Sequence, residues 1–329
     1  MNDESQGANN SGAASAGPDA TLAGIARLSH FGLIRFSGDD AQAFLHGQLS
    51  CDVNALQPWQ ALYGSYNTAK GRMLASFLLW RDDTGYVMQL PRVLCEAIRK
   101  RLSMYVLRSK VKAFDVSENY VLLGIAGTTA EMLLRPLFDN IPSTTLAMST
   151  TAGAHLLRLD ATRFEIMADP QSGDEIRSTL IACGVPISEA AWDWTNIQAG
   201  IPFITPATQD QFVPQMANLD LINGVSFTKG CYPGQEIVAR MHYLGKLKQR
   251  MYLADITGPD VPQPGDKLYS ADTGEQATGM IVNAAPSPAG GYAALAVMHI
   301  ASFNGGEVRL KSSDGPLLKF VALPYKIPS

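Results

Sequence analysis

The octapeptide Lys229-Gly230-Cys231-Tyr232-Pro233-Gly234-Gln235-Glu236 is the most informative stretch of this chain. It places a single thiol between a lysine and the predicted start of a helix. Pro233 suits the first position of that helix, which would continue through Arg240 and Tyr243. A thiol near a helix N-terminus, with a cation beside it, loses its proton more easily than a free cysteine. The octapeptide therefore predicts a reactive thiol, a site for a small anion, or both. The alternative is a Gly-Pro turn in which Cys231 is a small buried apolar residue.

Upstream of the octapeptide, helical and strand-like patterns alternate from about Leu22 onward. Helices are predicted at 39–49 (capped by Asp39), 91–104 (with Val93, Leu94, Ala97, Ile98 and Leu102 inward), 131–138, 174–182 and 189–199. Strands are predicted at 62–67, 73–80, 85–90, 110–116, 120–125, 155–159 and 163–167, with Lys70-Gly71 in a turn. Such alternation predicts a layered α+β region rather than a long parallel sheet. Residues 203–228 are expected to be ordered but irregular, as many functional loops are.

Downstream of Gly245 the pattern changes to short strands separated by turn residues. The predicted strands are 249–256, 266–269, 279–284, 291–299, 308–310 and 318–321. Short strands of this kind are typical of a small antiparallel barrel. We therefore expect a disordered tail at 1–20, an α+β region at 21–244 and a C-terminal β-barrel at 245–329.

The composition describes an ordinary soluble globular protein of 329 residues, with 46% hydrophobic and 17% charged residues and a net charge of −4. The four cysteines, at 51, 95, 183 and 231, form no C-x-x-C pair. They predict neither a zinc or permanent cluster site nor a disulfide framework, and reduced thiols in a cytoplasm fit best. No apolar run is long enough to span a membrane, and residues 1–20 do not form a signal peptide. No phosphate-binding loop or dinucleotide fingerprint favours a nucleotide cofactor.

Positive charge is concentrated in two stretches. Residues 99–112 carry six cations and no acid, and residues 229–250 have a net charge of +4. Solvated helix and strand faces are one explanation. The other is an anionic ligand or partner, such as a multiply charged carboxylate tail or an RNA backbone.

Residues 62–76 hold a second group of candidate binding residues. Tyr63, Tyr66 and Asn67 could stack on and hydrogen-bond a flat heterocycle, while Lys70 and Arg72 supply charge. The alternative is a surface hairpin with amphipathic tyrosines.

Taken together, these motifs resemble the YgfZ family, folate-binding relatives of the glycine-cleavage T-protein (aminomethyltransferase). The resemblance covers about residues 22–325, and its most specific part is 227–240, which is similar to the family's K-G-C-Y-x-G-Q-E signature. Weaker matches occur in the family's order: 44–48 with Asp52, 69–72, 105–111, 199–202, and 212–215 with Asn218.

The resemblance implies three lobes around a central channel that binds tetrahydrofolate or a derivative, with the second lobe at about 117–186 and the barrel as the third. It also implies a role in making or repairing iron–sulfur clusters in client enzymes, including enzymes that thiolate tRNA. The expected partners are folate and iron–sulfur enzymes or assembly factors, with an indirect link to tRNA and no membrane.

Cys231 would be the functional thiol, favoured as thiolate by Lys229. The motif residues Gln235 and Glu236 would also belong to the cofactor site. Arg240 and Lys246 would meet the folate carboxylates, and Tyr63, Tyr66, Asn67, Lys70 and Arg72 would lie near the pterin.

One departure from the T-protein disfavours glycine cleavage. Ala75-Ser76 stands where T-proteins carry an acidic pair, and neither residue can replace the carboxylate that assists aminomethyl transfer. Two alternatives to the accessory role remain. One is a folate-dependent one-carbon transferase with a different substrate, and the other is an RNA-binding module that uses the two basic stretches.

Overall fold

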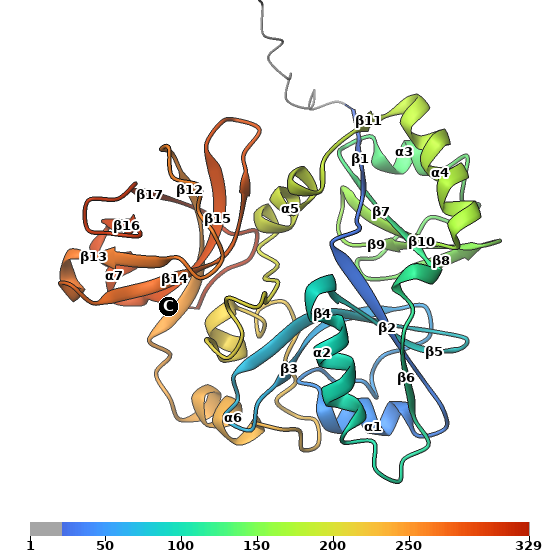
Figure 1. Ribbon diagram of the computed structural model, residues 1–329, viewed down its shortest axis with the longest axis horizontal. Helices are drawn as coiled ribbons and strands as arrows, with labels where there is room; N and C mark the ends of the chain where they lie inside the picture. Colours follow the sequence, from blue (N-terminus) through green and yellow to red (C-terminus); the bar gives the residue numbers. More distant parts are fainter. Residues whose placement is uncertain (1–21, 329) are drawn as a thin grey trace, which may run out of the picture.

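Three β-sheets with flanking helices build the computed structural model, which describes residues 22–328 (Figure 1). The predicted tail at 1–20 lies outside the described residues. The mixed α+β class is confirmed, and the lobes meet around the single helix α5 (Glu189–Gln198). Trp192 of α5 is fully buried, and Gly124 of the second sheet leaves room for its indole ring.

The first sheet is antiparallel, in the order β3-β4-β5-β2-β6. Its strands are β2 (Phe31–Ser37), β3 (Ala61–Asn67), β4 (Met73–Asp82), β5 (Gly85–Pro91) and β6 (Lys112–Asp115). The helices α1 (Ala41–Gln48) and α2 (Arg92–Ser103) pack on it, burying an apolar core that includes Phe36, Leu45, Phe77 and Ile98. Short apolar runs bounded by turn residues explain why the sequence located the central strands β4 and β5.

The second sheet has the order β11-β1-β7-β10-β9-β8. Its strands are β1 (Gly24–Arg27), β7 (Val121–Ala126), β8 (Met148–Thr151), β9 (Ala154–Arg158), β10 (Arg163–Ala168) and β11 (Val185–Pro186), with helices α3 (Ala130–Leu134) and α4 (Pro170–Cys183). The sheet therefore takes a strand, β1, from the beginning of the described chain as well as strands from within the predicted lobe.

The third sheet contains only strands from the C-terminal part of the chain, in the order β16-β13-β14-β15-β12-β17. They are β12 (Gln249–Ile256), β13 (Lys267–Ser270), β14 (Ala277–Pro286), β15 (Tyr292–His299), β16 (Val308–Leu310) and β17 (Leu318–Val321), and the short helix α7 is Ile300–Gly305. The sheet curls until a single bridge joins Arg309 to Leu317 at its two edges. The predicted antiparallel barrel is thus confirmed as a curled sheet that forms a half-barrel.

Two details of the predicted helices are wrong. The cap of α1 is Asp40, which makes no side-chain capping bond, whereas Asp39 pairs with Lys110. On α2, Val93 and Ala97 are exposed, and Cys95 is buried with Leu94, Ile98 and Leu102 instead.

The segment between α5 and the third sheet is irregular, as predicted. It holds the short 3₁₀ turn Pro214–Ala217 and the helix α6 (Gln235–Tyr243). Asn218, in the left-handed conformation, donates through Nδ2 to the carbonyl of Met251 on β12 at 2.8 Å. Arg250 and Asp220 form a buried ion pair at 2.7 Å that fastens the segment to the half-barrel.

Candidate functional site

The octapeptide forms a loop that packs against the β3–β4 turn. Gly234, with φ of +81°, precedes α6, and a Cβ there would collide with the carbonyl of Thr68 and the backbone of Gly71. Gly71, with φ of +71°, contacts the first turn of α6 in return. Both positions need glycine because the backbones touch in a left-handed conformation. The structure therefore brings together two motifs that lie about 160 residues apart.

Helix α6, which begins within the octapeptide, starts two residues later than predicted. Pro233 precedes the capping Gly234, and the first helical residue is Gln235. Cys231 lies four residues before that helix and is exposed. The alternative in which Cys231 is a buried core residue is therefore wrong.

Lys229 is buried and tied to the end of helix α1. Its Nζ donates to the carbonyls of His46 and, at 2.6 Å, Leu49, and it lies 4.8 Å from the ring centre of Tyr232. Carbonyls at a helix C-terminus have no partner within the helix and attract a cation. The predicted effect of Lys229 on the Cys231 thiol stays a prediction, since the described bonds of this ammonium are made to α1.

Burial lowers the pKa of Lys229 to about 8, with Cys51 and Asp52 acting in the opposite direction. The Cys51 thiol is buried beneath Gly64, and burial raises its pKa to about 12. His46 faces Asp52, with Nδ1 and Oδ1 3.3 Å apart. Sequence reasoning assigned no role to His46 or Cys51, although the stretch 44–48 with Asp52 was among the family-like pieces.

The tyrosines predicted to stack on a ligand lie within the fold. Tyr66 and Asn67 are each 2% exposed, and both amide atoms of Asn67 lack a hydrogen-bond partner. Burial raises the pKa of Tyr63 to about 12. On the adjoining turn, Lys70 is exposed, whereas Arg72 donates at 2.5 Å to the carbonyl of Gln211.

The predicted binding residues on α6 differ in exposure. Gln235 accepts a hydrogen bond from the backbone of Tyr232 at 3.3 Å. Glu236, Arg240 and Lys246 are exposed. Their predicted contacts with folate stay predictions.

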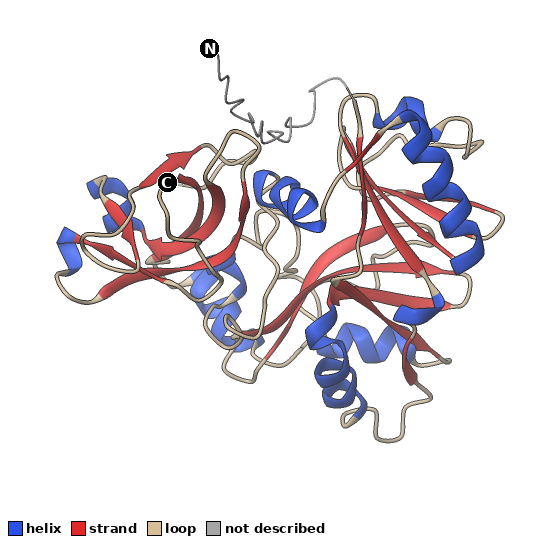
Figure 2. Cartoon of the chain, turned by 45° about the horizontal axis from the view of Figure 1, so that its top comes forward, coloured by secondary structure: helices blue, strands red, loops and turns tan. Residues whose placement is uncertain are grey.

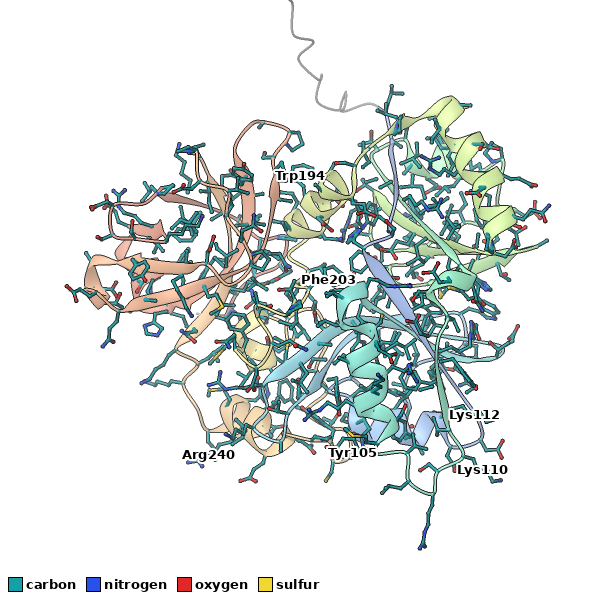
Figure 3. The ribbon with its side chains drawn as sticks, viewed as in Figure 1. Tyr105, Lys110, Lys112, Trp194, Phe203 and Arg240 are labelled. Atoms are coloured by element: carbon teal, nitrogen blue, oxygen red, sulfur yellow. The ribbon has the colours of Figure 1, made fainter. Side chains whose placement is uncertain are left out.

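A cavity of about 550 Å³ opens where the first sheet, α5 and the third sheet meet. Phe31 and Phe203 form an aromatic wall with ring centres 4.8 Å apart. Asn283 of β14 fixes Phe203 by two hydrogen bonds to its backbone, of 2.9 and 2.8 Å. Figure 3 labels Phe203 in the middle of the molecule.

The polar side of this cavity comes mainly from α5. His30 Nε2 lies 3.0 Å from Asp193 Oδ1, and its Nδ1 lies 3.4 Å from Glu189. Burial opposes protonation of His30, but the two carboxylates outweigh it and raise its pKa. Asn196, also in the wall, has a buried Nδ2 without a hydrogen-bond partner.

Ser76, one of the two residues predicted to stand where T-proteins carry an acidic pair, bonds to the backbone on both sides of Phe203. Its hydroxyl donates to the carbonyl of Pro202 at 2.8 Å and accepts from the amide of Ile204 at 2.9 Å. The hydroxyl thereby holds the segment that carries the aromatic wall.

A second cavity, of about 640 Å³, lies on the other side of α5 and includes Arg163 and Trp194 (Figure 3). Arg163 joins the two cavities through a 2.7 Å hydrogen bond to Asn196. Nearby, burial raises the pKa of Glu165 to about 7, and Gln89 hydrogen-bonds to its carboxyl group. None of the functional and cofactor-binding residues predicted from sequence lines either cavity, although Ala199 and Ile201 of the family-like piece 199–202 do. Sequence reasoning missed Glu165 and Arg163, because polar residues that alternate with apolar ones in β10 are also found in strands without a functional site.

Within residues 22–328, no helix is long and apolar enough to cross a membrane, and no group of three metal-ligating side chains converges on one point.

Comparisons with known proteins agree with this architecture. Residues 20–223 match the model of the GCVT N-terminal domain family. The "tRNA-modifying protein YgfZ" of Colwellia psychrerythraea is 33% identical over 254 residues, which cover 76% of this chain and 77% of that protein. The protein of the same name from Yersinia pseudotuberculosis is 30% identical over 91% of this chain and 92% of that protein. The glycine cleavage system aminomethyltransferase T of Bartonella henselae has the same fold, with a TM-score of 0.75 at 16% identity, covering 92% of this chain and 86% of that one.

Proposed function

Because the chain belongs to the YgfZ family and carries a GCVT N-terminal domain, we propose that it acts in tRNA modification as a folate-binding accessory protein for iron–sulfur enzymes. The relatives that span most of the chain are named tRNA-modifying proteins. That likeness, together with an exposed thiol in the signature octapeptide, is the observation that carries the proposal.

The central cavity fits a pteridine. A flat heterocycle needs an aromatic wall and a few polar groups that fix its orientation. Phe31 and Phe203 supply the wall, and the unpartnered Nδ2 of Asn196 supplies a donor for a ring carbonyl or nitrogen. The cavity volume of about 550 Å³ is within the range of small-molecule sites.

Each side chain of the cavity has a distinct part in holding the cofactor. Phe203 would stack on the ring, and Asn283 keeps Phe203 in place. Asp193, which orients His30, would accept hydrogen bonds from ring N–H groups. Arg92, in the cavity lining, would attract the carboxylates of the glutamate tail, and it also pairs with Glu118. When bound, a folate supplies a carrier for one-carbon units.

The Cys231 thiol is available to a client enzyme because it lies on the surface. A thiolate is a ligand for iron and a nucleophile toward sulfur. One cysteine supplies one of the four thiolates that a cluster normally takes. In this proposal Cys231 therefore contacts iron or sulfur that a client carries, as cargo rather than as a resident group.

Calorimetry with a stable reduced folate tests the cofactor. Wild type should bind, and Phe203→Ala should weaken binding by about tenfold through loss of stacking and packing. Arg240→Ala and Tyr66→Phe test the sites predicted from sequence in the same titration. If Phe203→Ala binds folate as well as wild type does, the cavity is not the folate site.

Complementation tests the cellular role. A strain lacking the related protein should recover its content of thiolated tRNA nucleosides with wild type and not with Cys231→Ser, while Cys183→Ser, at the other exposed thiol, should complement fully. Normal nucleoside content with Cys231→Ser would remove the thiol from the proposal. A turnover assay with methylene-tetrahydrofolate and candidate amines decides whether the one-carbon transferase alternative holds.

A further inference from the structure

Three aromatic rings meet at the C-terminal end of α6, two from the helix itself and one, Phe227, from the segment before the octapeptide. Phe227 and His242 stack with centres 3.7 Å apart and planes 12° from parallel. Tyr243 meets both edge-on, at 6.4 and 4.8 Å. His242 and Tyr243 are exposed, the latter by 63%. His242 and Tyr243 therefore form an aromatic platform open to solvent, with Phe227 against one face of His242.

Exposed cations lie on α6 and on the segments beside it. Lys70, Arg240 and Lys246 are exposed, and none of them makes an ion pair within residues 22–328. Lys70 comes from the β3–β4 turn that packs on the start of α6. Glu236 is the one exposed carboxylate on the helix itself. Figure 3 shows Arg240 pointing away from the molecule at its outer edge.

Exposed rings flanked by unpaired cations are what single-stranded nucleic acid binds, since bases stack on the rings and phosphates meet the charges. We propose that the exposed surface of α6 and its flanks, with Lys70, Arg240, His242, Tyr243 and Lys246, binds an unpaired stretch of RNA such as a tRNA loop. The inference rests on the proposed role in tRNA modification and gives that role a direct RNA contact.

The octapeptide loop leads directly into the proposed RNA-binding surface. Cys231 is exposed four residues before α6, so RNA bound along the helix lies beside the thiol. The overall charge of −4 does not oppose this, because the cations are local and the exposed helix carries one acid. An acidic protein would be attracted by the same charges, but it would gain less from the free faces of His242 and Tyr243.

Fluorescence anisotropy with a labelled twelve-nucleotide RNA and with unmodified tRNA tests the proposal. Wild type should bind both, and affinity should fall with salt with a slope near −2 in a double-logarithmic plot, as expected of about three phosphate contacts on a single strand. Tyr243→Ala should weaken binding by about fivefold or more, whereas Tyr243→Phe, which keeps the ring, should bind as wild type.

Charge variants provide the matched comparison. The double variant Arg240→Gln, Lys246→Gln should make the salt slope less steep by about 1.4. Lys319→Gln, an exposed and unpaired cation on β17 of the half-barrel, should leave the slope unchanged. Polyglutamate and heparin serve as competitors that carry charge but no bases.

The proposal would be overturned if wild type bound no RNA at 100 mM salt, or if Tyr243→Ala bound RNA as tightly as wild type does. It would also be overturned if Tyr243→Ala weakened the competition by heparin as much as it weakened RNA binding. Folate calorimetry on the same preparations separates the two proposals. Loss of RNA binding with folate binding and complementation intact would refute the α6 surface alone.

Discussion

Replacing Lys229 by methionine should change how stability depends on pH. Lys229 is buried, and burial lowers its pKa from 10.5 to about 8. Below pH 8 both the folded and the unfolded chain hold the proton. Between pH 8 and 10.5 the unfolded chain holds it more often, so this group makes the free energy of unfolding rise with pH. Lys229→Met removes the group and keeps most of its volume.

The size of the effect follows from the two pKa values. From pH 7 to pH 9.5 the free energy of unfolding of wild type should gain about 2 kcal/mol relative to Lys229→Met. Deprotonation leaves two N–H donors on the amine, enough for the carbonyls of His46 and Leu49. The bonds to α1 therefore survive, and the charge alone is lost.

The measurement is urea unfolding followed by tryptophan fluorescence at several pH values. Buried tyrosines make the free energy of unfolding fall with pH, which is opposite to the effect of Lys229. Their contribution is shared by wild type and variant, so it cancels in the difference. Lys70→Met is the matched control, because Lys70 is exposed and its loss should give a difference that does not vary with pH. A difference for Lys229→Met that stays constant within about 0.5 kcal/mol would refute the burial of this ammonium.

Three further predictions concern other sites. Glu165→Gln should gain stability relative to wild type as the pH rises, with the difference in the free energy of unfolding growing by about 2 to 3 kcal/mol from pH 5 to pH 8. The reason is that the carboxyl group loses its proton near pH 4.5 in the unfolded chain and near pH 7 in the folded one. Urea unfolding at several pH values checks this, and a difference between variant and wild type that does not change with pH would contradict it. Iodoacetamide should label Cys231 in the native protein at least tenfold faster than the buried Cys51, as peptide mass spectrometry would detect. Asp220→Asn should lower the free energy of unfolding by about 3 kcal/mol, since it leaves Arg250 buried without its carboxylate, and a loss below 1 kcal/mol would show that water reaches the guanidinium.

The sequence predicted most strands closely, and the reason is local. In β12, β16 and β17 the predicted and observed bounds agree, because turn residues mark both ends of each strand. Helix starts were less accurate. Pro233 fits a first helical position, but contact between Gly234 and the β3–β4 turn delays α6 by two residues, and a contact between distant segments leaves no mark in local spacing.

The parts of the candidate site likewise differ in how well local sequence predicts them. The thiol loop was predictable because its residues are consecutive in the chain. The cavity was not, because Phe31, Asn196 and Phe203 come from β2, α5 and the loop after α5. Lys229 illustrates the limit: it lies two residues from Cys231 in sequence, but its ammonium bonds to carbonyls at the end of α1.

One hairpin connects the two parts of the site. Ser76 on β4 holds the segment that carries Phe203, and Gly71, five residues earlier, contacts Gly234 of the thiol loop. Gly71 lies in the turn two residues before β4 begins at Met73, so the cavity wall and the thiol loop contact neighbouring parts of one hairpin. If the cavity holds a folate as proposed, this hairpin is the element that it shares with the thiol loop. The contact between the hairpin and the loop is close, because a Cβ at Gly234 would collide with the backbone of Thr68 and Gly71, and a Cβ at Gly71 would meet Gly234 at 3.0 Å in a left-handed backbone.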